Sequence, residues 1–528
     1  MPASTSVTSS PPHLPPLVLT GAPLTFDEVE QVARRARPVS LDPAARARLD
    51  GARQGVDAAA RGPQAIYGLN TGFGSLSRRR IEPHEVREVQ RNLIRSHAAG
   101  VGEPLPVEVV RAMMLILAAG LARGRSGVRT ELAEALLGML NRHITPVIPC
   151  RGSVGASGDL APLAHLALVL IGEGEATIAD HPDGSSAAAL PGGEALRLVG
   201  LKPLALEAKE GLALINGTHL MTALGALAII DTRRLLDAAV AGLAIAIDAC
   251  RATDAFLDDR LHEARRQPGQ RAVAARVRDM LRGSTILDAH RVDDPRVQDP
   301  YCLRAAPVVL GAAVDAIEHV RGVFERELGA VTDNPLVFAG EGGPPAFLSG
   351  GNFHGMPLAI ALDSLKIALC HVAGVAERRI NWLLTASDSE NPVNIYLSPQ
   401  PGLHSGLMIA QYTAAACCNE LMTLAFPASV GNIPTSAGIE DYNSMGATSA
   451  RQARLAVDLA TQVIAVELLV MTEAMEYQRP LRSGAGVERV YKTVRALVPR
   501  LTADRPPSPD IAAIAGLIRG GQFAGPDR

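Results

Sequence analysis

Aromatic side chains are scarce in this sequence of 528 residues. It contains 1 Trp, 7 Tyr and 9 Phe, which together make up 3% of the chain, although 47% of the residues are hydrophobic. The core must therefore consist mainly of small and aliphatic side chains, among which Ala and Leu are frequent. Because Ala and Leu are strong helix formers, the composition predicts a mostly α-helical protein with a large core.

Lysine is scarce as well, so arginine carries almost all of the positive charge. Only four lysines occur, and they are Lys202, Lys209, Lys366 and Lys492. The formal net charge is −3, and no long arginine-rich stripe is present. Proteins that bind nucleic acid through its phosphates present clustered positive charge. The charge pattern therefore argues against a nucleic-acid partner.

Cysteines at C-x-x-C spacing and long hydrophobic runs are also missing. The six cysteines are scattered without the C-x-x-C spacing typical of zinc and redox sites, which favours reduced thiols in the cytoplasm and no bound metal. The longest uncharged apolar run, Ala112–Ala122, lies between two arginines and is shorter than the roughly 18 residues that span a bilayer. We therefore expect no membrane-spanning segment.

Motifs of several common enzyme classes do not occur. There is no G-x-x-x-x-G-K-[ST] phosphate loop, no G-x-G-x-x-G opening a helix after a strand, no H-E-x-x-H metal helix and no G-x-S-x-G nucleophile elbow. These patterns bind phosphates, dinucleotides and zinc, or present a nucleophilic serine. Their absence weighs against nucleotide-dependent, zinc-dependent and α/β-hydrolase chemistry.

Composition divides the chain into four predicted parts. Residues 1–24 are rich in Pro, Ser and Thr and are predicted to form a disordered tail, whereas residues 25–200 form a loop-rich N-terminal domain. Residues 201–480 are predicted to form a central helical bundle, and residues 481–528 a C-terminal helical segment and tail. At the start of the second part, Thr25 and Glu28 have the spacing of a capping box, which predicts a helix start.

Three long aliphatic segments form the predicted bundle, over residues 212–249, 358–384 and 445–476. They carry apolar residues on nearly all sides, with few breaks. A helix that is apolar all round is buried, either at the centre of a large bundle or between subunits. We therefore expect a large up-and-down helical bundle and a homo-oligomer.

One loop combines serine and glycine just before an apolar run, and it reads Gly152-Ser-Val-Gly-Ala-Ser-Gly-Asp-Leu-Ala-Pro-Leu-Ala-His165. By residue type alone it is a turn before a helix, with Ser157 or Asp159 as the helix cap. Its sequence closely resembles the signature of the aromatic amino acid ammonia-lyase family. That family includes histidine, phenylalanine and tyrosine ammonia-lyases and related aminomutases.

The resemblance implies that Ala156, Ser157 and Gly158 cyclise by themselves into a 4-methylidene-imidazol-5-one prosthetic group, without any external cofactor. Small residues suit this reaction, because the nitrogen of Gly158 has to reach the carbonyl carbon of Ala156 through a compressed backbone. Loss of water from Ser157 then leaves an alkene. Ordinary side chains are nucleophiles, acids or bases, whereas elimination of ammonia calls for an electrophile.

The similarity covers about residues 27–501 and implies roles for other residues. Tyr67, in the loop Tyr67-Gly-Leu-Asn-Thr-Gly-Phe-Gly, matches the expected base for the β-proton of the substrate. Asn216 matches an asparagine that would hold the substrate carboxylate or the prosthetic ring. Phe353, in Gly350-Gly-Asn-Phe-His-Gly, matches a wall that shields the electrophile.

The block Gln298-Asp-Pro-Tyr-Cys-Leu-Arg304 also matches the family. Arg304 would grip the substrate carboxylate in bidentate fashion, which suits a planar guanidinium. Tyr301 would lie by the prosthetic ring as a catalytic residue, and Gln298 would be a substrate-binding residue. Active sites of the family collect loops from several subunits, so the resemblance implies a homotetramer.

Two positions carry most of the information about the substrate. His97, in the pair Ser96-His97, matches histidine ammonia-lyases and would meet the substrate side chain, although some bacterial tyrosine-selective members share this pair. Glu440 matches the histidine ammonia-lyases, because the phenylalanine and tyrosine lyases have no acid at this position. A carboxylate can pair with an imidazole N–H, whereas against an apolar ring it would be buried and unpaired.

Three positions near the implied pocket depart from the histidine pattern, and they are His404, Tyr442 and Asn443. The predicted reaction is the removal of ammonia from L-histidine to give trans-urocanate in a cytoplasmic enzyme. Two alternatives stay open. One is the same chemistry on tyrosine or phenylalanine, including a 2,3-aminomutase, and the other is a catalytically silent helical scaffold.

Overall fold

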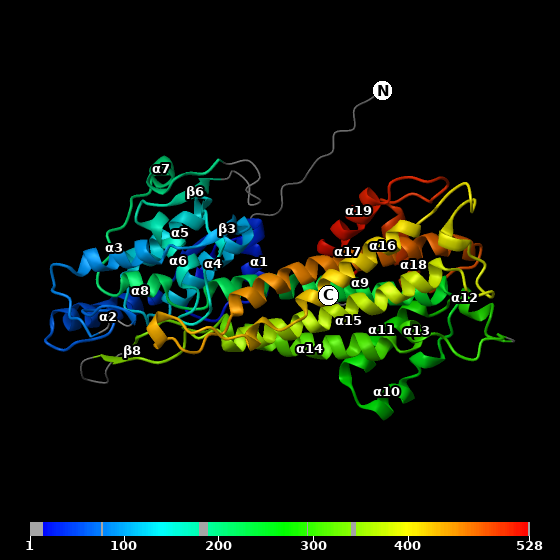
Figure 1. Cartoon of the computed structure of the whole chain (residues 1–528), viewed down its shortest axis with the longest axis horizontal. Helices are drawn as coiled ribbons and strands as arrows, with labels where there is room; N and C mark the ends of the chain where they lie inside the picture. The colour runs from blue at the N-terminus through cyan, green and yellow to red at the C-terminus, as the bar shows by residue number, and fades with distance from the viewer. Residues whose placement is uncertain (1–13, 75–77, 179–187, 293, 339–344, 526–528) are drawn as a thin grey trace, which may run out of the picture. The chain divides into compact units, whose positions relative to one another are not determined.

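The structure is a computed structural model of the chain, and it describes residues 14–74, 78–178, 188–292, 294–338 and 345–525 (Figure 1). The chain divides into two compact units, each assembled from three stretches. Unit 1 takes its residues from 1–227, 324–358 and 431–447, and unit 2 takes its residues from 228–323, 359–430 and 448–528. This division differs from the predicted domain limits, because distant segments can pack into one unit without any local change in composition.

Four long helices pass from one unit into the other, and they are α9 (His219–Ala249), α14 (Ala306–Glu327), α15 (Met356–Leu384) and α17 (Gly446–Gln478). The remaining helices of unit 1 are α1 (Phe26–Arg35), α2 (Pro43–Arg61), α3 (Val86–His97), α4 (Val107–Leu121), α5 (Thr130–Asn141), α6 (Leu160–Leu170), α7 (Gly192–Leu198), α8 (Glu210–Ile215) and the 3₁₀ turn η5 (Ser436–Gly438). Unit 1 is therefore helical as well, although loops and short strands join its helices.

The strands of unit 1 are two to four residues long and form small sheets. They are β1 (Leu17–Leu19), β2 (Val39–Leu41), β3 (Val101–Pro104), β4 (Ile144–Pro146), β5 (Pro149–Arg151), β6 (Glu175–Ile178), β7 (Leu190–Pro191), β8 (Leu336–Phe338) and β9 (Ala346–Leu348). The sheets pair β1 with β2 in parallel, and β3 with β5, β4 with β6, β6 with β7 and β8 with β9 in antiparallel fashion. These sheets connect the helices rather than form a layer of their own.

Residues 14–24 of the predicted tail, 1–24, include a strand. Residues 1–13 of that tail lie outside the described residues. Leu17 and Leu19 are buried, and β1 pairs in register with Val39–Leu41. The reason is that two apolar residues at alternate positions can bury one face of a short strand, which overrides the polar composition around them. The predicted capping box is confirmed, because the Thr25 hydroxyl accepts the N–H of Glu28 and the Glu28 carboxylate accepts the N–H of Thr25.

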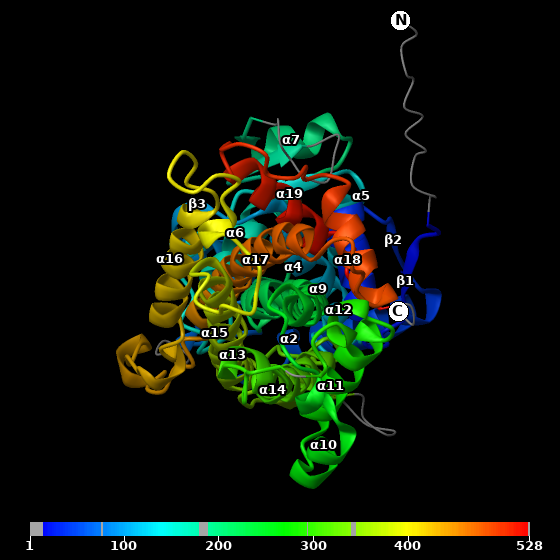
Figure 2. The same ribbon diagram turned by 90° about the vertical axis from the view of Figure 1, so that its right-hand side faces the viewer.

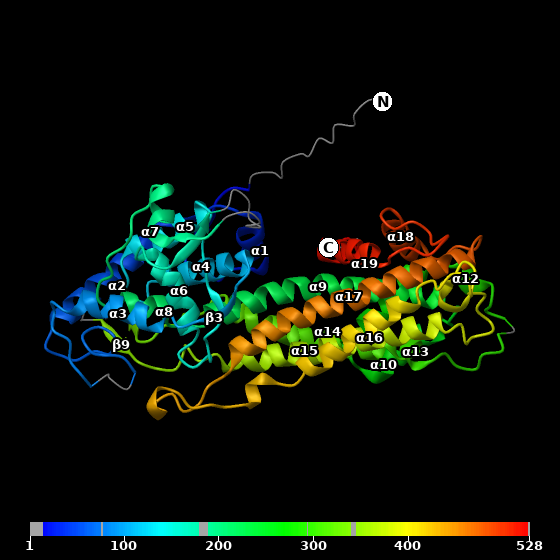
Figure 3. The same ribbon diagram turned by 45° about the horizontal axis from the view of Figure 1, so that its top comes forward.

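Unit 2 is built around long helices that run side by side. Its other helices are α10 (Asp259–Arg265), α11 (Pro268–Leu281), α12 (Thr285–Asp288), α13 (Tyr301–Arg304), α16 (Met408–Leu424), α18 (Ala485–Arg495) and α19 (Ser508–Arg519), with 3₁₀ turns η2 (Ala255–Leu257), η3 (Ile395–Leu397) and η4 (Ala428–Val430). Figures 1 and 3 show α9, α14, α15, α16 and α17 along one another, and Figure 2 looks along α9. The predicted mostly α fold with a helical bundle is confirmed.

The helices α15 and α17 are long and apolar enough to cross a membrane by length and composition alone. However, 61% of the most apolar window of α15 and 83% of that of α17 are buried inside the fold. Burial of this kind is what the core helices of a large bundle show.

One predicted helical run is broken, and the break has consequences for the site. The pattern over residues 212–249 forms two helices, α8 and α9, because Asn216 is extended and Gly217 has φ +125°. A Cβ at Gly217 would lie 2.5 Å from the Thr332 Oγ1, so only glycine fits there. The break leaves Asn216 at the end of α8.

Candidate functional site

A cavity of about 1010 Å³ lies within unit 1. Figure 3 shows α3, α6 and α8 close together in this unit, and residues of α3 and α8, together with Leu160 at the start of α6, line the cavity. Residues of four further segments complete its walls. Seven of the residues predicted from sequence line it, and they are Tyr67, His97, Ala156, Ser157, Asn216, Phe353 and Glu440. The fold thus gathers these residues from positions nearly 400 apart in the chain.

The Ala156-Ser157-Gly158 loop lies between β5 and α6 and is held against Gly217. The Gly217 N–H donates to the Ser157 carbonyl at 3.3 Å, and the Asp159 N–H donates to the Gly217 carbonyl at 2.7 Å. Gly158 has φ +75°, and a Cβ there would lie 2.0 Å from the Gly217 oxygen. No other amino acid fits this position without displacement of the backbone. The loop is therefore tightly turned, with small residues where the chain is crowded.

Asp159 fastens this loop to the start of α9. Its Oδ2 accepts the N–H groups of Leu220 and Met221 at 2.8 and 3.0 Å, and its Oδ1 accepts the Ser153 hydroxyl at 2.8 Å. The side chain is fully buried, and burial raises the pKa of Asp159 to about 6 against the lowering effect of these hydrogen bonds. Asp159 stands at the N-cap position of the following helix, α6, as predicted, but its carboxylate makes no capping hydrogen bond there and accepts the N–H groups at the start of α9 instead.

Glu440 lies beside Ser157, and both residues line the cavity. The Ser157 hydroxyl donates to Glu440 Oε1 at 3.3 Å, and the Thr435 hydroxyl donates to Glu440 Oε2 at 3.2 Å. The loop that carries Glu440 is bent at Ser436 and Ala437, which have φ +51° and +53°. Non-glycine residues adopt such angles only when their surroundings hold them there, so the position of Glu440 is imposed by the fold.

Tyr67 belongs to the glycine-rich loop between α2 and α3. Its hydroxyl oxygen accepts the N–H of Gly74 at 3.3 Å, and its ring packs edge-on against Phe73, with the ring centroids 6.4 Å apart. Burial raises the pKa of Tyr67, the Gly74 N–H opposes that rise, and the negative charge of Glu440 adds to it. Tyr67 is therefore largely protonated at neutral pH.

His97 is at the last turn of α3 and is half-buried. Its Nδ1 lies 2.9 Å from the carbonyl oxygen of Leu93 and 3.0 Å from the Ser96 hydroxyl, and the carbonyl, which can only accept, favours a proton on Nδ1. Burial lowers the pKa of His97, although the Leu93 carbonyl and the charge of Glu440 act in the opposite direction. A neutral ring with its proton on Nδ1 leaves Nε2 as a hydrogen-bond acceptor.

Asn216 has its amide nitrogen committed to neighbouring residues. Nδ2 donates to Oδ1 of Asp333 at 3.4 Å and to the carbonyl of Asn334 at 3.2 Å. Oδ1 is buried and has no hydrogen-bond partner among the described residues. Oδ1 is thus a hydrogen-bond acceptor that could take an N–H group.

The structure does not bring Gln298, Tyr301 and Arg304 into this cavity. They belong to unit 2, where Arg304 donates to Gln298 Oε1 at 2.7 Å and to the Asp299 carbonyl at 2.8 Å. The guanidinium carbon of Arg304 lies 4.5 Å from the centre of the Tyr301 ring, whose residue is 71% exposed. The three residues therefore form a cluster of their own on the single chain.

The cavity also contains residues that the sequence analysis did not select as site residues. Asn334, His354 and Tyr442 line it, and His354 Nε2 lies 2.9 Å from the Tyr442 carbonyl oxygen. A signal was available for Asn334, which stands in the block Thr332-Asp-Asn-Pro that also matches the family. No local pattern marked His354 as a support for the loop of Glu440.

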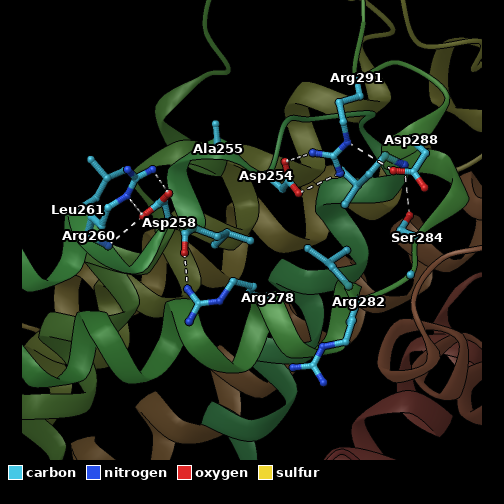
Figure 4. Close-up of a pocket in the computed structure, with 14 residues that line it drawn as sticks. Asp254, Ala255, Asp258, Arg260, Leu261, Arg278, Arg282, Ser284, Asp288 and Arg291 are labelled. Carbon is cyan, nitrogen blue, oxygen red and sulfur yellow. Dashed lines mark hydrogen bonds and ion pairs between the residues drawn. The ribbon is translucent and has the colours of Figure 1, made fainter.

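A second cavity, of about 920 Å³, lies in unit 2 among η2, α10, α11 and α12 (Figure 4). Its charged side chains are Asp254, Asp258, Arg260, Arg278, Arg282, Asp288 and Arg291. Arg260 pairs with Asp258 at 2.7 Å and Arg291 with Asp254 at 3.3 Å, so most of this charge is neutralised within the cavity wall. None of the predicted site residues lines it. In the part of the chain that the structure describes, no group of three or more His, Cys, Asp or Glu could hold a metal ion.

The helical fold and a cavity lined by the tightly turned Ala-Ser-Gly loop indicate an enzyme, and comparison with known proteins agrees. Residues 24–496 match the model of the aromatic amino acid lyase family, so the chain belongs to this family of carbon–nitrogen lyases. It is 47% identical to the histidine ammonia-lyase of Sorangium cellulosum, over 96% of this chain and 97% of that protein. It is also 47% identical to the histidine ammonia-lyase of Koribacter versatilis, over 96% and 98% of the two chains.

Solved structures show the same similarity. The histidine ammonia-lyase of Trypanosoma cruzi superposes with a TM-score of 0.87 at 38% identity, covering 96% of this chain and 94% of that one. The tyrosine aminomutase of Streptomyces globisporus superposes with a TM-score of 0.88 at 35% identity, covering 96% and 97%. Members of the family with different reactions thus share this fold.

Proposed function

We propose that the chain removes ammonia from L-histidine and releases trans-urocanate. The observation that carries this proposal is the carboxylate of Glu440, which lies 3.3 Å from the Ser157 hydroxyl in the cavity that His97 also lines. A carboxylate and a neutral imidazole acceptor suit a substrate ring with an N–H group, whereas a phenyl ring would offer neither of them a hydrogen-bond donor. The relatives named histidine ammonia-lyase, at 47% identity over nearly their whole length, support the same substrate.

The residues Ala156, Ser157 and Gly158 fit the 4-methylidene-imidazol-5-one group of the proposal. Gly158 adopts a backbone conformation that excludes a side chain, and Ala156 and Ser157 line the cavity. When formed, this group supplies an electrophile that makes the substrate amine a better leaving group, so no external cofactor is needed. Asp159 and Gly217 would hold the loop in place through the hydrogen bonds described above.

Tyr67 is the proposed base, which takes up the β-proton at its hydroxyl oxygen. The N–H of Gly74 donates to this oxygen at 3.3 Å and would stabilise the phenolate. Because the pKa of Tyr67 lies above its ordinary value, only a small fraction is deprotonated at neutral pH. The reaction is therefore expected to accelerate as the pH rises.

Glu440 and His97 are proposed to orient the substrate imidazole. Glu440 can accept one ring N–H, and Nε2 of His97 can accept a second donor, because its Nδ1 proton is used by the Leu93 carbonyl. Asn216 offers a further acceptor, Oδ1, which suits the substrate amine or an N–H of the prosthetic loop. Phe353 would cover the electrophile and limit the access of water.

We further propose a homotetramer in which Gln298, Tyr301 and Arg304 of one subunit complete the cavity of another. Arg304 would then supply the bidentate grip on the substrate carboxylate. Unit 2 supports association, because large apolar side chains of α15 and of the segment 408–426 are exposed on the single chain. They are Ile360, Ile367, Ile409, Tyr412, Met422 and Phe426. Light scattering on the purified protein tests this point, with a mass of four 55.3 kDa chains as the expected result.

A substrate screen tests the reaction itself. The protein is incubated with L-histidine, L-tyrosine and L-phenylalanine, and ultraviolet absorbance reports urocanate, coumarate or cinnamate. Urocanate from histidine is the expected result, and consumption of tyrosine without urocanate would contradict it. The alternative of a tyrosine or phenylalanine enzyme, or an aminomutase, is favoured by Tyr442 in the cavity and by the similarity to the tyrosine aminomutase.

A mass measurement separates the enzyme from a catalytically silent scaffold. Formation of the prosthetic group removes two waters, so the intact mass should be roughly 36 Da below that of the unmodified chain. The Ser157→Ala variant should stay folded, keep the full mass and lose almost all turnover. Unchanged turnover in this variant would overturn the proposed electrophile.

A cytoplasmic location is also part of the proposal. All six cysteines are free, although two of them, Cys417 and Cys418, are adjacent in the chain. Burial raises the pKa of Cys250 and holds its thiol protonated. Such unreactive thiols suit a reducing compartment.

A further inference from the structure

Lys209 is a buried lysine close to the cavity of unit 1. It is one of four lysines in the chain, and its side chain is 0% exposed. It stands directly before α8, in the left-handed conformation with φ +73°. A lysine is almost never fully buried unless its charge is paired, and a bulky residue at positive φ is uncommon. Both features indicate that the surrounding structure holds this side chain for a reason.

The charge of Lys209 is paired with Asp333, whose other oxygen serves the cavity. Lys209 Nζ lies 2.6 Å from Asp333 Oδ2. Asp333 Oδ1 accepts the amide nitrogen of Asn216 at 3.4 Å and the N–H of Asn334 at 2.6 Å. Asn216 and Asn334 both line the cavity, whereas Lys209 and Asp333 do not.

Lys209 also lies close to the loop that carries Tyr67, the proposed base. A Cβ at Gly68, the residue after Tyr67, would lie 3.8 Å from Lys209 Cδ. The same position would meet Leu212 of α8 at 2.5 Å. The lysine stem therefore packs where the Tyr67 loop meets the helix that ends at Asn216, as the long methylene chains of lysines often do.

We propose that Lys209 is a positioning residue for Asn216. Its ammonium group pairs with the Asp333 carboxylate, and that carboxylate, together with the Asn334 carbonyl, holds the Asn216 amide with Nδ2 turned to the protein and Oδ1 left as an acceptor in the wall of the cavity. This inference rests on the proposed function, because it gives Asn216 a role in binding the substrate of that reaction.

The physical reason lies in the symmetry of an amide. Rotation of the Asn216 amide by half a turn exchanges its acceptor and its donor, with little change in shape. The Asp333 carboxylate and the Asn334 carbonyl both accept only, so together they fix the orientation, whereas a displaced Asp333 would leave the Asn334 carbonyl alone to hold the amide. Without the ammonium group the buried carboxylate would lose its ionic partner, and it would move away from Asn216.

Steady-state kinetics with L-histidine test the proposal on Lys209→Met and Lys209→Arg. The methionine variant is expected to lose at least about tenfold in kcat/KM, and the arginine variant, which keeps the charge, should recover most of that loss. A double-mutant cycle with Asn216→Ala then asks whether the effect passes through Asn216. In the Asn216→Ala background, Lys209→Met should lower kcat/KM only slightly further. Losses that simply multiply in the double variant would overturn the proposal.

A binding measurement supplies a readout besides turnover. Calorimetry with L-histidine is carried out on Ser157→Ala, which cannot turn over, and on the same variant with Lys209→Met. The dissociation constant is expected to rise about tenfold when Lys209 is replaced, because the acceptor is no longer held toward the ligand. Equal dissociation constants would overturn the proposal. The intact mass of Lys209→Met should still show the loss of two waters, which separates positioning of the substrate from maturation of the loop.

Variants that remove both charges of a buried pair serve as controls for misfolding. Should Lys209→Met fail to fold, the double variant Lys209→Met with Asp333→Asn removes the unpaired charge and should fold, yet remain impaired. The matched control is Lys366→Met with Asp363→Asn, a buried pair of unit 2 at 2.8 Å that does not line the cavity. Its kcat/KM should stay within about threefold of the unmodified enzyme.

The outcomes distinguish this proposal from the proposed function. A wild-type protein that releases no urocanate from L-histidine would contradict the proposed function. An active wild type with a Lys209→Met variant of equal kcat/KM would overturn only the role of Lys209. An equal loss in the control pair of unit 2 would also overturn it, because the effect would then be a general result of removing buried charges.

Discussion

Neutralising Glu440 should impair the reaction with histidine more than any other single change in side-chain charge within the cavity of unit 1. The substitution Glu440→Gln keeps the size of the side chain and its hydrogen bond with the Thr435 hydroxyl at 3.2 Å, whereas the Ser157 hydroxyl is lost when the proposed prosthetic group forms. It removes the negative charge that would face the substrate imidazole. The variant is therefore expected to fold normally.

The magnitude follows from the loss of a charge-assisted hydrogen bond. Hydrogen bonds to charged groups contribute about 1.5–3 kcal/mol in folded proteins. A loss of this size in the transition state lowers kcat/KM roughly 10- to 150-fold. The charge of Glu440 also raises the pKa of Tyr67, so its removal should move the rise of activity with pH toward lower pH.

Initial rates of urocanate formation between pH 7 and pH 10, followed by ultraviolet absorbance, measure both effects. The control is Glu318→Gln, an exposed carboxylate of α14 that pairs with Arg321, and its rates should equal those of the unmodified enzyme. Unchanged kcat/KM in Glu440→Gln would refute the assignment of the imidazole to this carboxylate. A gain of activity on tyrosine in the same variant would favour the alternative substrate.

Three further outcomes are expected. Gly158→Ala should abolish the loss of two waters and all turnover, because its Cβ would lie 2.0 Å from the Gly217 oxygen, and intact mass measures this directly. Tyr67→Phe should lose at least about 100-fold in kcat and with it the rise of rate toward alkaline pH, whereas a pH profile like that of the unmodified enzyme would contradict its role as base. His219 is fully buried, and burial lowers its pKa to about 4, below the ordinary value of 6.5. In the unfolded chain His219 therefore takes up a proton at a higher pH than in the folded protein. The free energy of unfolding is expected to fall by about 3 kcal/mol as the pH falls from 6.5 to 4. His219→Gln should abolish this part of the acid sensitivity in urea titrations at pH 7 and pH 4.5, and an unaltered difference between the two would speak against it.

Predictions of helix starts and helical runs agree with the structure where interactions between neighbouring residues determine the backbone conformation. The capping box at Thr25 forms as expected, and the aliphatic runs that begin near residues 358 and 445 form long helices. The run over residues 212–249 does not form one helix, because Gly217 turns away from helical angles to meet Gly158. That contact joins residues 59 positions apart, and no periodicity within a short window contains it.

Composition and motifs by themselves determined the helical class, the aliphatic core and the residues of the Ala-Ser-Gly loop, since helix propensity and sequence signatures are properties of neighbouring residues. Only the tertiary structure decided which of those residues share a cavity. It placed Glu440 beside Ser157, left Arg304 in another unit, and brought the Asn216 amide to Asp333, which pairs with Lys209. Such contacts depend on how distant segments pack and on which hydrogen bonds and charges that packing leaves to be satisfied, and these are not encoded in any one stretch of the chain.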